Sequence, residues 1–332
     1  MNGDNYTMKE SNTKKIKLDK TVGRFFLLLI IFILLILGAC YINNRIQLRK
    51  EEAIYKPVGQ QVTVNGHKMN VYTEGKGEKT LVFMSGSGTT SPVFDFMSLD
   101  SLLSESFKVV VVEKAGYGFS EDSNISRDID TMLSETRQAL NLARVQGPYV
   151  LCPHSMSGIE AIYWAQKYPQ EVHAIIGLDM AVPETYESFK LNMFQINLGS
   201  LANSMGITRL LPEVSESEAM KYGTLTENEK KLCETLFYRG TLTKAMRNEL
   251  RQAKENAKKV GKNGNTNVPV LIFSSNGSGS GWNEAEWCKF QKDYINKLDN
   301  GKFIALDCSH YVHNHEYEKI AREIIDYLKN TA

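Results

Sequence analysis

Short apolar runs alternate with stretches of helical periodicity from residue 57 to the end of this 332-residue chain. The runs at 80–84, 108–112 and 149–152 are almost wholly apolar, which is typical of strands buried on both faces of a sheet. Between them, apolar residues recur at helical spacing over 127–143 and 157–168. Alternating strands and helices predict an α/β fold, with a mostly parallel central sheet and helices on both of its faces.

The pattern begins with a hairpin and is interrupted once. The turn Asn65-Gly66 lies between two strand-like segments and is a strong hairpin signal. Further strands are predicted at 61–64, 68–72, 172–178, 268–273 and 302–306, and a closing helix at 317–328. Strand signals cease between 183 and 265, where the chain is rich in Met, Leu and Lys and has amphipathic stretches. We therefore expect a core made of residues 57–182 and 266–332, with residues 183–265 inserted as a helical cap.

Residues 25–42 form an apolar segment of eighteen residues without a charge. As a helix this segment would be about 27 Å long, close to the ~30 Å hydrocarbon core of a bilayer. A basic tail at 1–24 precedes it, and a polar stalk with fewer basic residues follows at 43–56. We predict a single-pass transmembrane anchor, with the N-terminus inside and the large domain outside the cytoplasm.

Two kinds of processing are alternatives to an uncleaved anchor. Leu37-Gly38-Ala39-Cys40 resembles a lipobox, in which the Cys of a bacterial lipoprotein is acylated and becomes the new N-terminus. A cleaved signal peptide is the other, although the small-x-small cleavage pattern is poor here. Either an anchor or an acylated Cys40 would hold the chain at a membrane.

The distribution of charged residues and cysteines excludes some classes of partner and site. Residues 1–56 hold ten Lys and Arg against five Asp and Glu, whereas the rest of the chain holds 29 against 33. The basic excess therefore belongs to the N-terminal segment, and no nucleic-acid surface is expected elsewhere. The five Cys include no CxxC pair, so neither a disulfide framework nor a Cys-based metal site is predicted.

The segment at 149–158 carries the strongest sign of chemistry. Its strand leads into PHSMSG at 153–158, and a helix follows at once. Ser155 thus lies at the apex of a strand–turn–helix junction, which is the context of a nucleophile elbow. Pro153 and Ser157 stand where the G-x-S-x-G pattern has glycines, so the context rather than the motif singles out Ser155. A helix N-cap is the structural alternative for this Ser.

Residues 57–332 resemble the α/β-hydrolase superfamily. LVFMSGSG at 81–88 is similar to the family's strand and HG-x-G loop, with Ser85 in place of His. VVVEKAGYGFS at 110–120 is similar to the D-x-x-G-x-G-x-S loop after the next strand. LDCSHYVH at 306–313 is similar to the G-x-G/S-H segment after the last strand. The resemblance implies an α/β-hydrolase fold with a helical cap.

The same resemblance implies roles for individual residues. A Ser nucleophile needs a base, an orienting acid and N–H donors for the oxyanion. His310 takes the position of the base, with His313 as its rival three residues on. The backbone N–H groups of Met156 and Ser87 take the position of the oxyanion hole.

The orienting acid has two candidate positions. Many members of the superfamily carry it after the penultimate strand, but the residues after 268–273 include no carboxylate before Glu284. Asp179 follows the strand after the elbow helix, and this arrangement resembles that of haloalkane dehalogenases. We therefore expect Asp179 to be the partner of His310, with Glu284 or Glu286 as alternatives.

These features imply a serine hydrolase that cleaves a carboxylic ester or amide of a small molecule, without a metal or other cofactor. A proline-iminopeptidase-like aminopeptidase is the alternative, if an acidic cluster in the cap binds a free amine. The candidates for that cluster are Glu213, Glu216 and Glu218. A non-catalytic, membrane-tethered binding module is the alternative from another class. No second amphipathic helix rich in Trp and Lys is evident, which favours small or medium-sized esters over membrane lipids. The oligomeric state stays open.

Overall fold

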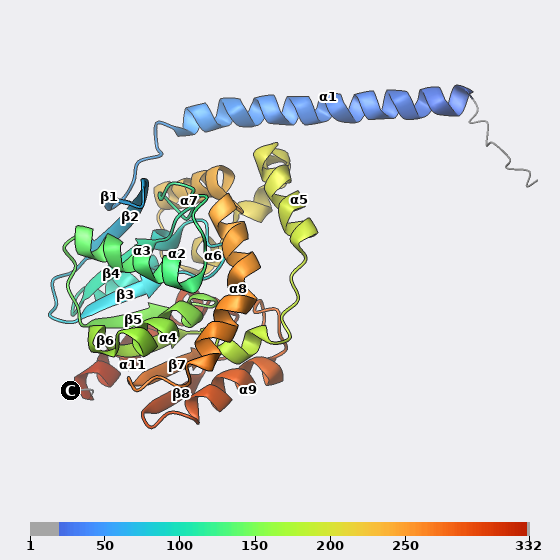
Figure 1. The fold of residues 1–332 in the computed structure, drawn as a ribbon. Coiled ribbons are helices and arrows are strands. Elements are labelled where there is room, and N and C mark those ends of the chain that lie inside the picture. The colour runs from blue at the N-terminus through green and yellow to red at the C-terminus, as the bar shows by residue number, and fades with distance from the viewer. Residues whose placement is uncertain (1–19, 331–332) are drawn as a thin grey trace, which may run out of the picture.

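The fold centres on one eight-stranded sheet in the order β1-β2-β4-β3-β5-β6-β7-β8 (Figure 1). The computed structural model describes residues 20–330, so most of the predicted basic tail, with Lys14, Lys15 and Lys17, lies outside the described residues. β2 runs antiparallel to both of its neighbours, and all other neighbouring strands are parallel. The strands are β1 (Gln60–Val64), β2 (His67–Glu74), β3 (Thr80–Met84), β4 (Lys108–Glu113), β5 (Tyr149–Pro153), β6 (Val172–Leu178), β7 (Val270–Ser274) and β8 (Gly301–Ala305). The predicted mostly parallel sheet is confirmed.

The central strands send alternate side chains into two separate cores. In β3, Val82 and Met84 join one cluster of buried residues, whereas Leu81 and Phe83 join the other. Successive side chains of a strand point to opposite faces, so a strand covered on both faces needs apolar residues at every position. This requirement explains the unbroken apolar runs of the sequence.

Helices cover both faces of the sheet (Figure 1). Residues of α3, α4 and α9 belong to the first core cluster, and residues of α2 and α11 belong to the second. The bounds are α2 (Pro92–Leu103), α3 (Ile129–Leu142), α4 (Ser157–Lys167), η1 (Pro169–Glu171), α9 (Glu284–Ile295), α10 (Val312–His315) and α11 (Tyr317–Asn330). The sheet is therefore the middle of three layers, as expected for a doubly covered parallel sheet.

The chain between β6 and β7 forms helices and short turns, without a strand in its fully described residues. Its elements are η2 (Pro183–Tyr186), α5 (Met193–Ser204), η3 (Ile207–Leu210), η4 (Pro212–Ser215), α6 (Glu218–Tyr222), α7 (Glu227–Gly240) and α8 (Lys244–Lys262). α8 is fastened to the core by Asn256, whose Oδ1 accepts a hydrogen bond from Ile129 N at 2.9 Å. The role of this segment as a cap domain with the boundaries 183–265 stays a prediction.

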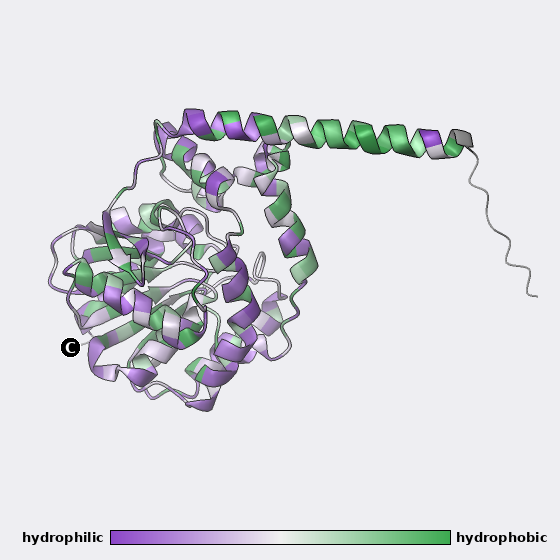
Figure 2. Ribbon diagram, turned by 45° about the horizontal axis from the view of Figure 1, so that its top comes forward, coloured by the Kyte–Doolittle hydropathy of each residue, from purple (hydrophilic) through white to green (hydrophobic). Residues whose placement is uncertain are grey.

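Helix α1 (Lys20–Glu51) stands clear of the body over its apolar part (Figures 1 and 2). It is long and apolar enough to cross a membrane, and only 6% of its most apolar window is buried. An N-terminal signal sequence passes the same test of length and composition. The C-terminal part of α1 is polar and contacts the body through Asn44, which is 2% exposed.

Candidate active site

Ser155 lies at the junction between β5 and α4, at the carboxyl end of a central strand. Its φ of +52° is in the left-handed region, which residues other than glycine rarely adopt. The turn is held by the hydrogen bond from Ala181 N to the carbonyl of Ser155 at 2.8 Å. Gly86, in the loop after β3, lies so close that a Cβ there would be 2.8 Å from Cβ of Ser155. Ser155 is partly exposed, and its hydroxyl has no hydrogen-bond partner within residues 20–330.

Ser157 and Gly158 together explain how the junction closes without the usual pair of glycines. Ser157 Oγ lies 2.5 Å from the carbonyl of Met84 and 2.8 Å from that of His154, which ties the turn to β3. A Cβ on Gly158 would come within 2.2 Å of the carbonyl oxygen of Ala181. The position that must lack a side chain is therefore 158, and position 157 tolerates a small hydroxyl side chain.

His310 and Asp179 form a buried hydrogen bond. Nδ1 of His310 lies 2.6 Å from Oδ2 of Asp179, which is the contact expected from the sequence. Because a carboxylate only accepts, Nδ1 donates this bond, and in the neutral form of the imidazole the lone pair then lies on Nε2. Nε2 makes no hydrogen bond within the described chain, so it can accept a proton from a hydroxyl.

The second carboxylate oxygen of Asp179 is held by three donors. Oδ1 accepts hydrogen bonds from Ser275 N at 2.7 Å, Trp287 Nε1 at 2.7 Å and Gln291 Nε2 at 3.3 Å. Asp179 itself is fully buried and has a φ of +52°. The donors fix the orientation of the carboxylate and replace the water that burial removes. Sequence reasoning missed Trp287 and Gln291, since no helix was predicted where α9 lies.

The alternative acids Glu284 and Glu286 lie away from His310. Both are exposed in the first turn of α9, where carboxylates favour the positive end of the helix. Glu286 accepts a hydrogen bond from Asn283 Nδ2 at 2.6 Å. The same helix directs Trp287 and Gln291 inward to Asp179, so α9 contributes hydrogen-bond donors to that carboxylate.

His313, the rival base, is fully buried and paired with a different carboxylate. Its Nε2 lies 3.1 Å from Oδ2 of Asp95, whose Oδ1 accepts from Asn314 Nδ2 at 3.2 Å. His154 lies between the two imidazoles, with ring centroids 4.6 Å from His310 and 4.7 Å from His313. Burial lowers the pKa of His154 well below its usual range, and the neighbouring imidazoles add to the effect. His154 therefore stays neutral and donates from Nε2 to the carbonyl of His310 at 3.2 Å.

Asp95, His154 and His313 also bring three possible ligand atoms within 4.8 Å of one another. All three residues are buried. The carboxylate of Asp95 and Nε2 of His313 already satisfy each other, and Nε2 of His154 is used by the carbonyl of His310. Hydrogen bonding accounts for the cluster, although Nδ1 of both imidazoles remains without a partner in the described chain. The prediction of a site without metal stays a prediction.

Two backbone N–H groups near Ser155 have no acceptor. Neither Met156 N nor Ser87 N donates a hydrogen bond to another group within residues 20–330. Buried N–H groups are normally satisfied, so free ones beside Ser155 can donate hydrogen bonds to an oxyanion. The loop of Ser87 is supported by Tyr117, whose OH accepts from Gly88 N at 3.4 Å.

Helix α8 covers this region. Tyr117 OH donates to Oε2 of Glu249 on α8 at 2.7 Å, and Lys114 forms a buried ion pair with the same carboxylate. Burial raises the pKa of Tyr117 well above its usual range, and the charge of Glu249 adds to the effect. Glu249 also lines a small gap above α4 together with Met156 and Ser157. The inserted segment therefore lies directly beside the residue that follows Ser155.

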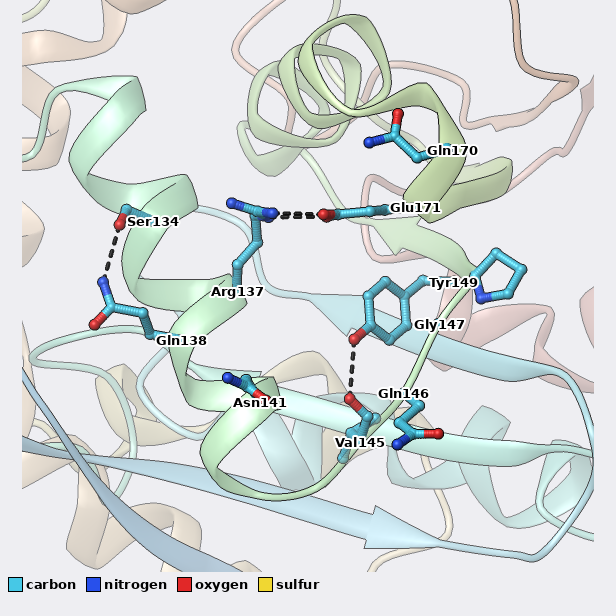
Figure 3. A pocket seen from close by; sticks show the side chains of 11 residues that line it. Ser134, Arg137, Gln138, Asn141, Val145, Gln146, Gly147, Tyr149, Gln170 and Glu171 are labelled. Carbon is cyan, nitrogen blue, oxygen red and sulfur yellow. Dashed lines mark hydrogen bonds and ion pairs between the residues drawn. The ribbon is translucent and has the colours of Figure 1, made fainter.

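A separate hollow of about 550 Å³ lies at the opposite end of β5 (Figure 3). Tyr149, which begins the strand, lines it together with the ion pair of Arg137 and Glu171. Reactive groups in sheets of this kind collect at the carboxyl ends of the strands. The hollow is at the amino end of β5 and is therefore no part of the site around Ser155.

Comparison with known proteins connects this geometry to a family. The model of a hydrolase family described as "Serine aminopeptidase, S33" matches residues 75–280, which include Ser155 and Asp179 but not His310. The uncharacterized protein YbdG of Bacillus subtilis (strain 168) is 41% identical over 261 residues, covering 77% of this chain and 80% of that protein.

Solved structures share the fold. The enol-lactonase from Burkholderia xenovorans LB400 matches with a TM-score of 0.61 and 13% identity, covering 82% of this chain and 100% of that chain. A haloalkane dehalogenase loop variant from Bradyrhizobium elkanii matches with a TM-score of 0.59 and 16% identity, covering 82% of this chain and 96% of that chain. At these identities the likeness establishes the fold alone, which is the predicted α/β-hydrolase fold.

Proposed function

The chain belongs to the α/β-hydrolase family described as serine aminopeptidase, S33, and on that premise we propose that it cleaves carboxylic esters of small molecules through an acyl-enzyme on Ser155. The observation that carries this proposal is the 2.6 Å hydrogen bond between Nδ1 of His310 and Asp179. In the neutral form of the imidazole this bond places the lone pair on Nε2, as a general base requires.

The proposed reaction has two halves. Ser155 Oγ attacks the ester carbonyl carbon while Nε2 of His310 takes the hydroxyl proton. The oxyanion of the tetrahedral intermediate accepts hydrogen bonds from the N–H groups of Met156 and Ser87. Collapse of the intermediate breaks the ester C–O bond, and the imidazolium returns its proton to the leaving alcohol. Water then attacks the acyl-enzyme by the same route, which releases the carboxylic acid and restores Ser155.

An aminopeptidase is the second candidate, since the family description names that activity. Capture of a free amine needs an unpaired carboxylate close to Ser155. The buried carboxylate of the inserted segment, Glu249, is already neutralised by Lys114. Of the candidates from the sequence, Glu216 pairs with Lys221 at 3.6 Å and Glu218 with His315 at 2.8 Å, whereas Glu213 is exposed. Two of these three carboxylates, Glu216 and Glu218, are thus already paired, which supports the ester over the aminopeptidase.

We also propose that α1 is a single-pass anchor that holds the hydrolase domain outside the cytoplasm. The exposed apolar residues of α1 support this, because they have no protein surface to cover them. The polar end of α1 is fixed to the body by Arg209, which bonds Asn44 at 2.7 Å and both carboxylate oxygens of Glu51. A helix held in this way is part of the folded enzyme, which favours an uncleaved anchor over a removed signal sequence.

Hydrolysis of p-nitrophenyl esters of graded chain length tests the ester proposal. We expect turnover by the wild-type chain, preference for short or medium acyl chains, and loss of turnover in Ser155→Ala. Faster turnover of aminoacyl p-nitroanilides than of any ester would favour the aminopeptidase instead. An absence of turnover on both, with no reaction of Ser155 with acylating probes, would leave a binding module on a hydrolase scaffold.

A further inference from the structure

Helix α5 exposes a stripe of large apolar side chains. Phe194, Leu198 and Leu201 are 75%, 55% and 57% exposed. Their spacing of four and three residues places them on one face of the helix. Asn203 lies on the opposite side of the helix axis from this stripe. It is buried, and its Nδ2 donates to the carbonyl of Tyr238 on α7 at 3.1 Å. The inner face of α5 is thus packed on the body, and the outer face is apolar and open.

The turns η3 and η4, of which η3 packs beside α5, also expose apolar side chains. Leu210, Leu211 and Val214, from η3, the residue after it and η4, are each more than half exposed. α5 itself contains no charged residue among its twelve. A contiguous exposed apolar surface on a folded protein marks a place of contact with another molecule or with a membrane. We define these six residues of α5, η3 and η4 as the apolar face.

The apolar face begins where the apolar part of α1 ends. Asn44 Nδ2 donates to the carbonyl of Ser204, the last residue of α5, at 3.2 Å. A Cβ on Gly206 would come within 2.8 Å of the carbonyl oxygen of Cys40. Counted from Phe25, a helix crosses a hydrocarbon core of ~30 Å in about 20 residues, which is close to Asn44. The C-terminal end of α5 is therefore level with the membrane surface if α1 spans the membrane.

The orientation of α5 is also consistent with contact along the membrane surface. Figure 1 shows α5 lying crosswise to α1, with one end close to it, and Figure 2 shows that this end lies near the stretch where α1 changes from hydrophilic to hydrophobic. That end is the C-terminal one, because Ser204 accepts a hydrogen bond from Asn44. A helix that crosses a membrane anchor at that level lies along the membrane and not through it. Arg209 fixes the arrangement, because it bonds Asn44 and Glu51 of α1 from η3.

We propose that the apolar face of α5, η3 and η4 is a second membrane contact, which rests in the interfacial region of the bilayer that α1 spans. This inference rests on the proposed anchoring by α1. The occupant is the lipid surface, because α1 brings it to this level and because α5 offers apolar side chains without charge. The inserted segment is then held at the membrane by two contacts, the bonds of Arg209 to α1 and the apolar face itself. Helix α8 of the same segment covers the region of Ser155. A bilayer contact of this kind is that of an interfacial helix.

Quenching of introduced Trp fluorescence by brominated lipids tests the proposal. Full-length Leu198→Trp would be reconstituted into phosphatidylcholine vesicles with bromine atoms on the acyl chains near the headgroup, and full-length Ile33→Trp into vesicles with bromine atoms near the chain ends, because Ile33 lies in the middle of the apolar segment. Vesicles without bromine are the reference, and the controls are measured in both kinds of brominated vesicle. Ile33→Trp, in the apolar part of α1, reports anchoring itself. Leu142→Trp is the matched control, since Leu142 is an exposed Leu of the same kind on α3, 49% exposed. The wild-type chain, with Trp164, Trp282 and Trp287, gives the background.

We expect Leu198→Trp and Ile33→Trp to lose fluorescence in brominated vesicles, while Leu142→Trp changes no more than the background. Quenching of Ile33→Trp without quenching of Leu198→Trp would overturn the second contact and leave the anchor intact. If neither is quenched, the anchoring proposal fails and the second contact fails with it. Lack of quenching at Leu198 together with cross-linking of this face to a second copy would assign it to pairing and would also overturn the proposal.

Discussion

Nδ1 of His310 and Oδ2 of Asp179 lie 2.6 Å apart, although β7 separates the strands that precede them. Asp179 follows β6 and His310 follows β8, so the carboxylate has to reach across the end of β7. The residue after β7, Ser275, gives its N–H to Asp179 at 2.7 Å. The end of the penultimate strand therefore supplies a backbone donor to Asp179, and no carboxylate follows that strand before Glu284.

Asp179→Asn should reduce kcat by about 10⁴, by analogy with the same change in other triads. The amide cannot hold the Nδ1–H tautomer of His310 and leaves the imidazole without its charged partner. Steady-state kinetics on a soluble ester measures the change. Glu286→Gln is the matched control and should keep wild-type kcat, because Glu286 is exposed on α9. The assignment is wrong if Glu286→Gln loses activity and Asp179→Asn keeps it.

Trp287→Phe should lower both kcat and the free energy of unfolding. The ring still fills its buried space, but Oδ1 of Asp179 loses the donor at 2.7 Å. A hydrogen bond to a charged group contributes about 1.5–3 kcal/mol to stability. Thermal unfolding and kinetics are measured beside Trp282→Phe, whose indole does not contact Asp179 in the described hydrogen bonds. Equal effects of the two changes would argue against a role for Trp287 in holding the acid.

Glu113 should make the enzyme less stable as the pH rises from about 4.5 to about 8. Burial raises the pKa of Glu113 to about 8, and the N–H groups of Phe119 and Val93 oppose the rise only in part. In that pH range an unfolded chain has lost the proton that the folded chain keeps, so the free energy of unfolding falls with pH. Glu113→Gln should flatten this part of the pH dependence, measured as the thermal midpoint in mild detergent. An unchanged slope would contradict the account.

The sequence predicted that the three residues of the proposed triad follow strands, because the apolar runs of buried strands can be recognised in it. Ser155, Asp179 and His310 each follow an apolar run, and the carboxyl ends of parallel strands meet at one edge of the sheet. The hydrogen bonds of Ser157 could not be predicted from its position after a strand. Its place in the motif suggested only a small residue, whereas its hydroxyl bonds two carbonyls at the base of the elbow.

The sequence did not predict the contacts made by residues on unpredicted helices or far apart in the chain. Trp287 and Gln291 lie on α9, which has a weak apolar pattern because Asp179 needs polar donors on its inner face. The apolar face of α5 has neither Trp nor Lys, the residues sought as signs of a membrane-surface helix. The contact of Asn44 with Ser204 joins residues 160 positions apart, which local pattern cannot reveal.

A chain that begins at residue 43 should hydrolyse a soluble short-chain ester with the kcat of the full-length enzyme. It lacks the apolar segment but keeps Asn44 and Glu51, which bond Arg209. A chain that begins at residue 53 loses both contacts and should melt at a lower temperature. Activity assays in detergent-free buffer and thermal melts compare the two. Should the first chain be inactive on soluble esters, while the full chain in vesicles cleaves lipid esters, lipids would replace small esters as the substrate class.

Reaction with a fluorophosphonate tests the central assignment most directly. The probe phosphonylates an activated Ser with loss of fluoride, and the adduct is located by peptide mass spectrometry. We expect one adduct per chain, on Ser155, which is absent in Ser155→Ala and forms much more slowly in His310→Ala. A full-strength adduct in Ser155→Ala, or an adduct mapped to another Ser of the wild-type chain, would contradict it.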